Sequence, residues 1–386
     1  MVVSVPESDL DVAVVGGGPV GLLIGLMLRQ KGIATRVFEQ RIKPSTHSRS
    51  IGVHPPSLKV LTQAGVGEAF DKAGLNIRKG HAIVNGRTAG AIDFSKLSGP
   101  FNYVMSIPQY VNEAILEKAL EETDPGAMCR GAKVSELTES NDGCELKFEH
   151  HDGTLKSIRA KFVIGADGKN SFVRKSLGIS FHGKTYPASY LMGDFPNSMQ
   201  PAHDAFIYLG REGLVESFPL PGNLRRWVVK TPSMIQEAKP EQLTSIIADR
   251  TGQALNPTEN RMISSFGIQK MEAESFWNGR TVLAGDAAHV ISPIGGQGMN
   301  LGWLDGALLA NKLDAIIKRG ADYKTEFADY ESQRRKSFRE AVKRSELNMW
   351  FGKEHRFSLS RHIAAKAITS NFLSAKFARM FTMDGL

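Results

Sequence analysis

The pattern of apolar and polar positions at the start of the chain predicts a strand, a turn, a helix and a second strand. Residues 11–15 form a short apolar run rich in valine, as a buried parallel strand requires. Glycines follow, residues 22–29 predict a packed helix, and residues 34–39 predict a second strand that ends in an acid. Glycine and proline break this apolar region, which is shorter than the roughly 20 residues of a membrane-spanning helix.

Two later segments have the same character. Residues 163–168 predict a strand that runs into a turn. Residues 281–283 predict a strand followed by a glycine-rich loop and a helix that begins near Met299. Between these segments lie three runs with alternating positions, residues 205–209, 214–218 and 225–230. The alternation indicates an antiparallel sheet with one covered face.

From Tyr330 onward the chain has helical character. Residues 331–349 are highly charged, and residues 361–380 mix apolar with basic side chains. We interpret the last segment as an amphipathic helix packed on the core. The alternative is a basic helix that rests on an anionic membrane or on a partner protein.

Composition narrows the range of partners. The chain has 386 residues with a net charge of +8, which favours anionic ligands such as dinucleotides, or acidic lipid. The basic residues are scattered and form no nucleic-acid-binding motif, so we expect no nucleic-acid partner. The two cysteines, Cys129 and Cys144, supply neither a metal site nor a disulfide framework. A reducing, cytoplasmic location is therefore expected.

The first glycine-rich turn is a dinucleotide-binding fingerprint. Gly16, Gly18 and Gly21 form G-x-G-x-x-G between the predicted strand and helix, and Glu39 follows about 20 residues later. Gly16 permits the tight turn, Gly18 lets the backbone approach a pyrophosphate, and Gly21 lets helix and strand pack closely. The helix N-terminus favours the phosphates, and Glu39 can accept hydrogen bonds from the adenosine ribose. This motif alone does not separate FAD from NAD.

The second motif, from Gly165 to Arg174, reads G-A-D-G-x-x-S-x-V-R. It resembles the second signature of the FAD-dependent aromatic hydroxylases, in which the motif touches FAD near the pyrophosphate. Asp167 and Gly168 also make a good turn without any ligand, and Arg174 also fits a surface ion pair.

The third motif runs from Gly279 to His289 and continues through Pro293 to a glycine-rich segment, residues 295–300. It resembles the corresponding string of the class A FAD-dependent monooxygenases, the p-hydroxybenzoate hydroxylase-like aromatic hydroxylase family. Asp286 can bind a ribityl hydroxyl of the flavin. The N-terminus of the following helix would face the pyrimidine end of the flavin ring, which becomes anionic on reduction.

The resemblance covers roughly residues 10–320 and includes Arg49, in a loop that contacts the flavin in this family, and Gln109, which matches a glutamine that contacts FAD. It implies an α/β fold, with a Rossmann-like FAD-binding domain, an inserted antiparallel-sheet substrate domain and a C-terminal helical segment. We assign residues 1–80, 106–178 and 279–325 to the FAD-binding domain, 81–105 and 179–278 to the substrate-binding domain, and 326–386 to the helical region. The thioredoxin-like domain of the phenol hydroxylase branch is not expected.

Cofactor contacts are predicted at the motif positions, namely Gly16, Gly18, Pro19, Val20, Gly21, Glu39, Gln40, Arg41, Arg49, Gln109, Asp167, Gly168, Arg174, Gly285, Asp286, Pro293, Gly296, Gly298, Met299 and Asn300. The aromatic side chains of the predicted antiparallel sheet are substrate-pocket candidates, namely Tyr190, Phe206, Tyr208, Phe218 and Trp227. Strands present alternate residues to two faces, so most of these aromatics are expected in the core and one or two in the pocket.

The resemblance also implies the chemistry. NADPH or NADH binds transiently and reduces FAD, O2 forms a flavin C4a-hydroperoxide, and its distal oxygen passes to an electron-rich carbon of an aromatic or polycyclic small molecule. No catalytic side chain is identified. Pro293 and His54 are candidates because they lie in motif loops, as does His289, although we favour structural or flavin-adjacent roles for the histidines. No metal is expected.

Two other functions fit the same motifs. One is an FAD-dependent reductase, dehydrogenase or halogenase on this fold, although the W-x-W-x-I-P signature of halogenases is missing. The other is a non-catalytic flavin-binding interaction protein that docks through its C-terminal helix. The sequence gives no oligomeric state.

Overall fold

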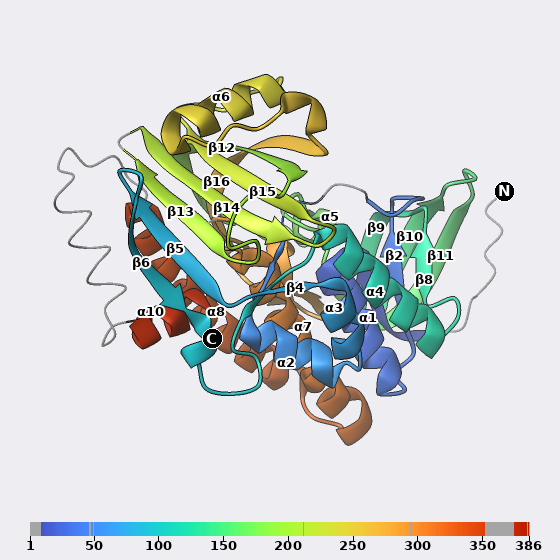
Figure 1. The fold of residues 1–386 in the computed structure, drawn as a ribbon. Helices are drawn as coiled ribbons and strands as arrows, with labels where there is room; N and C mark the ends of the chain where they lie inside the picture. Colours follow the sequence, from blue (N-terminus) through green and yellow to red (C-terminus); the bar gives the residue numbers. More distant parts are fainter. Residues whose placement is uncertain are drawn as a thin grey trace.

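A computed structural model of the chain describes residues 9–45, 48, 50–210, 212–293, 295–351, 374–383 and 385. Two large mixed sheets and a set of helices beneath them form the molecule (Figure 1). The helices are α1 (Pro19–Gln30), α2 (Pro55–Gln63), α3 (Gly67–Ala73), α4 (Gln109–Thr123), α5 (Phe172–Ser176), α6 (Pro240–Thr251), α7 (Gln297–Arg319), α8 (Tyr323–Phe351) and α10 (Ser374–Phe381), with 3₁₀ turns η1 (Phe94–Lys96), η2 (Pro257–Glu259) and η3 (Gly285–Ala287).

The first sheet has a parallel centre. Its strands are β1 (Leu10–Val15), β2 (Thr35–Glu39), β8 (Met128–Arg130), β9 (Ala132–Glu139), β10 (Cys144–His150), β11 (Leu155–Gly165), β17 (Trp277–Asn278) and β18 (Thr281–Leu283). Strands β8, β2, β1, β11 and β18 pair in parallel, in that order. Residues Val12–Val14 are fully buried, because helices cover the sheet and the strand contacts apolar side chains on both faces.

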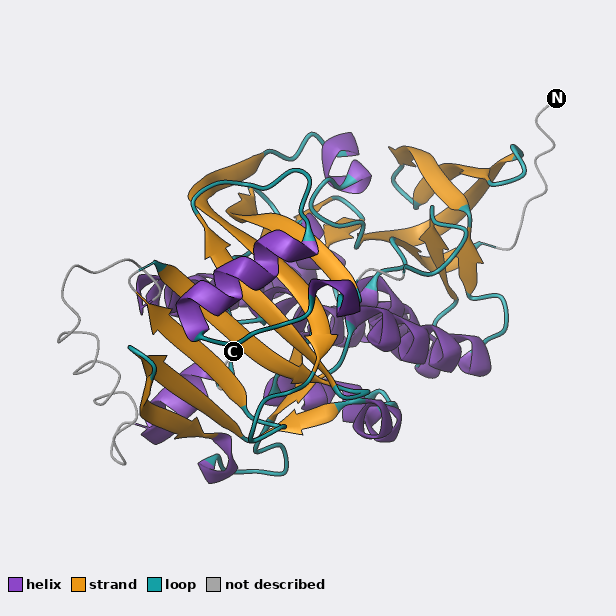
Figure 2. Cartoon of the chain, turned by 45° about the horizontal axis from the view of Figure 1, so that its top comes forward, coloured by secondary structure: helices purple, strands orange, loops and turns teal. Residues whose placement is uncertain are grey.

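The second sheet is largely antiparallel. Its strands are β5 (Lys79–Val84), β6 (Arg87–Asp93), β12 (Phe181–Pro196), β13 (Ala205–Gly210), β14 (Gly213–Leu220), β15 (Leu224–Thr231), β16 (Met262–Ala273) and β19 (His289–Val290), in the order β19-β16-β12-β15-β14-β13-β5-β6. Helix α6 lies across one face, as Figure 2 shows with this face turned forward. There Leu243 and Ile247 of α6 pack on Trp227 and Val229. A third, small sheet contains β3 (Gly52–Val53), β7 (Val104–Ser106) and β4 (Leu75–Ile77).

The C-terminal helix α10 packs on the body of the protein. It contacts β6 and η1, and Ala378 and the following Met383 are fully buried. Met383 shares an apolar cluster with Ile291, Leu301 and Phe338. The predicted amphipathic segment is thus a packed helix over residues 374–380, whereas residues 361–373 lie outside the described part of the chain. Among the described residues no helix is both long and apolar enough to cross a bilayer.

The structure confirms the predicted fold class and the strands and helices that were predicted within the described residues. The third motif's helix begins at Gln297, two residues before the expected start, and β11 ends at Gly165, before the turn at Asp167. The division into three regions stays a prediction. Sheet pairing joins β5 to β13 and places β19, from the third motif, at the edge of the second sheet.

Candidate functional site

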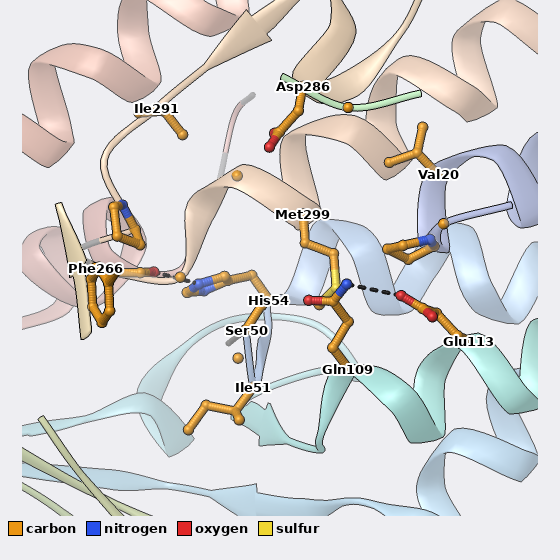
Figure 3. A pocket seen from close by; sticks show the side chains of 18 of the residues that line it. Val20, Ser50, Ile51, His54, Gln109, Glu113, Phe266, Asp286, Ile291 and Met299 are labelled. Atoms are coloured by element: carbon orange, nitrogen blue, oxygen red, sulfur yellow. Dashed lines mark hydrogen bonds between the residues drawn. The ribbon is translucent and has the colours of Figure 1, made fainter. Parts of the chain in front are cut away.

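A cavity of about 1180 Å³ lies between the two large sheets. On one side it is lined by the glycine turn after β1, the end of β2, the start of α4 and the loop between β18 and α7. On the other side its wall is the face of the second sheet that α6 does not cover. In Figure 3 Asp286, His54 and Gln109 reach this space from three different elements. The cavity therefore joins both predicted sites in one chamber.

The glycine turn after β1 has the geometry that its sequence predicts. Gly16 has φ 110°, and a Cβ atom there would lie 2.4 Å from the carbonyl oxygen of Ala166. A Cβ atom on Gly21 would lie 1.9 Å from the carbonyl oxygen of Gly16, so only glycine allows the helix to start this close to the strand. At Gly18, by contrast, no heavy atom of the described residues lies within 4 Å of such a Cβ atom. Gly18 instead lines the cavity.

The acid at the end of β2 is fixed by the same turn. Glu39 accepts hydrogen bonds from the backbone N–H of Gly17, at 2.8 Å, and from the backbone and Nε of Arg41, both at 2.9 Å. Burial of the Glu39 carboxylate opposes its ionisation, but these hydrogen bonds outweigh that effect and hold its pKa below the usual range. A charged acceptor therefore stands at the mouth of the turn.

Two polar side chains at the start of α4 face the cavity. Gln109 donates from Nε2 to Oε1 of Glu113 at 2.9 Å (Figure 3). The other oxygen of Glu113 is buried without a hydrogen bond among the described residues, 3.8 Å from the guanidinium of Arg41. Burial raises the pKa of Glu113. This pair leaves the oxygen of the Gln109 amide available to a ligand.

The third motif presents an acid and a helix N-terminus to the same space. Asp286, in η3, is exposed to the interior of the cavity and points into it in Figure 3. The surrounding walls displace water and raise the pKa of its carboxyl group. Helix α7 begins beside it with Gly296 at φ 66°, and no side chain of the described residues caps this end. Gly298 and Met299, in its first turn, line the cavity.

The comparison with known proteins agrees with this geometry. Residues 9–345 match the family described as FAD binding domain. The chain belongs to this family. The predicted FAD-binding family is thereby confirmed, and the relatives named below bear out the resemblance to the class A FAD-dependent monooxygenases.

Several relatives of this FAD-binding domain are named as monooxygenases. The chain is 33% identical over 317 residues to an uncharacterized aromatic compound monooxygenase of Bacillus subtilis, which covers 81% of this chain and 62% of that protein. It is 32% identical over 318 residues to a rifampicin monooxygenase of Streptomyces venezuelae, and the match covers 80% of this chain and 64% of that protein. The chain thus spans about three-fifths of these relatives. The solved p-nitrophenol 4-monooxygenase of Pseudomonas putida has the same fold, with a TM-score of 0.89, 24% identity, and 98% and 99% of the two chains covered.

Most predicted cofactor positions of this FAD-binding domain line the cavity, namely Gly16, Gly18, Pro19, Val20, Glu39, Gln40, Arg41, Gln109, Asp167, Gly168, Asp286, Pro293, Gly296, Gly298 and Met299. Gly21, Gly285 and Asn300 stand behind the lining. Asn300 accepts from the backbone N–H of His54 and donates to the carbonyl oxygens of Gly52 and Gly296, so it ties α7 to the loop before α2. Arg49 lies outside the described residues.

Two residues of the second motif have structural partners. Asp167 accepts hydrogen bonds from Ser171 and from the backbone of Phe172 and Val173, which caps α5. Arg174 is buried and does not line the cavity, contrary to its predicted contact. Its guanidinium donates to the carbonyl oxygens of Ala287 and Lys169, at 2.9 Å each. Arg174 therefore braces the loop that carries Asp286.

The aromatic substrate candidates fall mostly on the wrong face of the second sheet. Phe206, Tyr208 and Trp227 pack under α6. Tyr190 is buried on the cavity side but stacks on Phe266, at 5.6 Å between ring centroids, instead of lining the cavity. Phe218 alone of the five lines it. The cavity wall is built instead by the alternate residues of the same strands, including Met192, Ile207, Leu209, Leu214, Glu216, Phe218, Arg226, Val228 and Phe266.

Sequence reasoning missed the buried acid that supports the third motif. Asp305, on α7, is fully buried and accepts hydrogen bonds from the backbone N–H of Gly285 at 3.0 Å, from His289 Nε2 at 2.7 Å and from Arg334 Nε at 2.6 Å. Burial opposes its ionisation, but His289 and Arg334 hold its pKa below the usual range. An acid within the apolar run of a predicted helix is the signal that could have found it.

His54 has a structural role at the cavity wall. Its Nε2 lies 2.9 Å from the carbonyl oxygen of Gly295, while Nδ1 is buried without a partner among the described residues. Burial lowers the pKa of His54 to about 4, only partly opposed by the hydrogen bond to Gly295. The ring is therefore neutral at neutral pH and connects the loop before α2 to the loop before α7.

We expect His54 to reduce the acid stability of the apoprotein. Its pKa is about 4 in the folded chain and 6.5 ordinarily, so the unfolded state binds the proton more tightly. The free energy of unfolding should therefore fall by about 3 kcal/mol from this group as the pH decreases from 6.5 to 4. In His54→Gln this component is absent, so the variant should gain stability relative to wild type over that interval in urea unfolding. Parallel pH curves for the two proteins would contradict the assignment.

Proposed function

We propose that this chain is a single-component FAD-dependent monooxygenase that uses NADPH or NADH and O2 to hydroxylate an aromatic or polycyclic small molecule. The observation that carries the proposal is the single cavity, in which the glycine turn and Asp286 on one side face a mostly apolar wall on the other. A cavity of this size and composition suits a flat organic ligand beside a bound cofactor. The named relatives support the same reaction class.

The residues of the first side fit FAD. The open space at Gly18 suits the approach of a pyrophosphate to the backbone. Oε2 of Glu39 accepts only the hydrogen bond from Gly17 and retains acceptor capacity, which suits the adenosine ribose. Asp286 would accept a hydrogen bond from the ribityl chain, and the uncapped N-terminus of α7 would face the pyrimidine edge of the flavin.

Bound FAD would supply the electron transfer from the nicotinamide and the activation of O2. The chain itself would position the aromatic ring and limit the access of water. Met192, Leu214 and Phe266 provide apolar contacts on the roof of the cavity, and Phe381 of α10 adds a further wall. A dry site favours transfer of oxygen to the substrate over its loss as hydrogen peroxide. Because Ala378 of α10 is fully buried and Phe381 lines the cavity, we infer that the main role of α10 is this packing and not membrane contact.

Turnover tests this proposal directly. The purified protein is loaded with FAD and given NADPH or NADH with a panel of phenols, and oxygen uptake, nicotinamide oxidation and product mass are measured. A product heavier by one oxygen atom is expected. Nicotinamide oxidation with an unoxygenated product would instead indicate a reductase or dehydrogenase, and no nicotinamide oxidation across the panel would indicate a binding protein.

Asp286→Ala should weaken FAD binding without lowering the stability of the apoprotein. The carboxylate has no hydrogen-bond donor among the described residues and faces the cavity, so its removal costs no protein contact. A lost hydrogen bond to a charged group is worth about 1.5–3 kcal/mol, or roughly 10- to 100-fold in affinity. FAD titration and urea unfolding of the same preparation measure both effects. Full retention of FAD by the variant would refute the role of Asp286.

A further inference from the structure

One side chain in the apolar wall of the cavity is an acid. Glu216 lies in the middle of β14 and lines the cavity together with Leu214 and Phe218, its neighbours two residues away on the same face. Ile207 of β13 and Val228 of β15 stand directly opposite it in the adjacent strands, and both also line the cavity. The carboxylate is therefore surrounded by apolar side chains and opens toward the space where the ligand would bind.

The described part of the chain provides Glu216 with no hydrogen bond or ion pair. Arg226, which lines the same cavity, holds Asp194 of β12 through two hydrogen bonds of 2.7 and 2.8 Å. No charged side chain, Lys230 of β15 included, contributes to the pKa shift of Glu216, which comes from burial alone. Tyr190 of β12 is close enough to interact with the Glu216 charge but donates no hydrogen bond to it. Ala205, Ile207 and Leu209, the residues of β13 on this face, carry no charge.

Keeping a carboxylate in such a place is unfavourable for folding. An unpaired charge in apolar surroundings loses its hydration, and burial alone raises the pKa of Glu216 to about 7. A leucine or glutamine would fill the position at lower cost to stability. Acids with this environment are characteristic of sites where a proton is exchanged with a ligand.

We propose that Glu216 accepts a hydrogen bond, and then the proton, from a phenolic hydroxyl of the aromatic ligand. The inference rests on the proposed function and specifies its substrate class as a hydroxylated aromatic compound. In this step the O–H bond of the phenol breaks and an O–H bond forms on the Glu216 carboxylate. The charge passes to the phenol oxygen and is delocalised into the ring, which makes the ring carbons more electron-rich toward an incoming oxygen atom. No redox change takes place at Glu216.

Ligand binding tests the inference without turnover. The FAD-loaded protein is titrated with 2-naphthol and with its methyl ether, 2-methoxynaphthalene, at several pH values from 6 to 8. Wild type should bind 2-naphthol about tenfold more tightly at the upper end, because ionised Glu216 is the stronger acceptor. In Glu216→Gln, binding of 2-naphthol should be weaker and independent of pH over this range. The methyl ether, which has no proton to donate, should bind both proteins equally at all these pH values.

Glu212→Gln provides the matched control, because Glu212 is exposed at the turn of the same hairpin. It should behave as wild type toward both ligands. Glu216→Gln should be at least as stable as wild type in urea, since it removes an unpaired charge from apolar surroundings, so loss of folding does not explain an altered affinity. In steady-state turnover of 2-naphthol, kcat/KM of wild type should fall as the pH decreases from 8 to 6. This decline should be absent in Glu216→Gln.

The outcomes separate the two proposals. If the methyl ether binds and 2-naphthol shows the same affinity and pH dependence in wild type and Glu216→Gln, the role of Glu216 is refuted while an aromatic-binding site stands. If neither ligand binds wild type, the proposed aromatic substrate class fails, and the role of Glu216 fails with it. A pH dependence that is equal for both ligands would assign the effect to another group and also refute the role of Glu216.

Discussion

Asp305→Ala is expected to lower the free energy of unfolding by about 3–5 kcal/mol, the cost of removing one partner from a buried ion pair. Asp305 is fully buried between His289 and Arg334. Without the carboxylate, Arg334 keeps a buried positive charge with one remaining hydrogen-bond partner among the described residues, Ser337, and the backbone N–H of Gly285 loses its acceptor. Because Gly285 precedes Asp286, the loss should also disorder the loop that presents Asp286 to the cavity.

Urea unfolding of the apoprotein measures this effect, and Asp329→Ala is the matched control. Asp329 also joins α7 to α8, through Lys312, but its side chain is 47% exposed. Exposed ion pairs contribute about 0–1 kcal/mol, so the control should unfold almost as wild type does. Equal stabilities of the two variants would show that Asp305 is not the support of the third motif.

Gly18→Ala should weaken FAD binding by roughly 10- to 100-fold, which corresponds to about 1–3 kcal/mol of steric conflict. Gly18 has φ −79°, which any residue adopts, and the described residues leave open space around a Cβ atom there. The apoprotein should therefore keep its stability within about 0.5 kcal/mol. The methyl group would instead meet the ligand that approaches the backbone at this point.

Gly21→Ala should give the opposite pair of results, namely a less stable apoprotein and no direct steric conflict with FAD. Its Cβ atom would lie 1.9 Å from the carbonyl oxygen of Gly16, so β1 and α1 must move apart and the apoprotein should lose stability. FAD titration and urea unfolding of both variants give four values that test the turn. Native FAD affinity in a well-folded Gly18→Ala protein would mean that the cofactor does not approach the turn as proposed.

Local chemistry explains why the fingerprint was predictable. Gly16 and Gly21 are required by contacts within a few residues or with the adjacent strand, and the strand and helix around them have strong apolar patterns. The predicted fold class depended on such local units and was confirmed. The roles of Asn300 and Arg174 were harder to predict. Membership of a motif does not say whether a side chain faces the ligand or the loops behind it.

In the second sheet, the sequence pattern predicts the strands but not which of their faces lines the cavity. Alternation along β13 and β15 was visible in the sequence, but both faces of these strands are apolar, since α6 covers one and the cavity occupies the other. The largest aromatic side chains of these strands pack under α6, where they fill the core between the helix and the sheet. Smaller residues such as Ile207 and Val228 remained for the cavity. Only the position of α6, a long-range contact, decides between the two faces, and it also decides that Glu216 points inward.

The central claim is that three distant glycine-punctuated segments converge to hold one flavin dinucleotide. Titration of the purified apoprotein with FAD, followed by flavin fluorescence and absorbance after gel filtration, tests it most directly. We predict a yellow protein that retains one FAD per chain. Excess NAD should not displace this FAD. A protein that remains colourless after incubation with FAD would contradict the account.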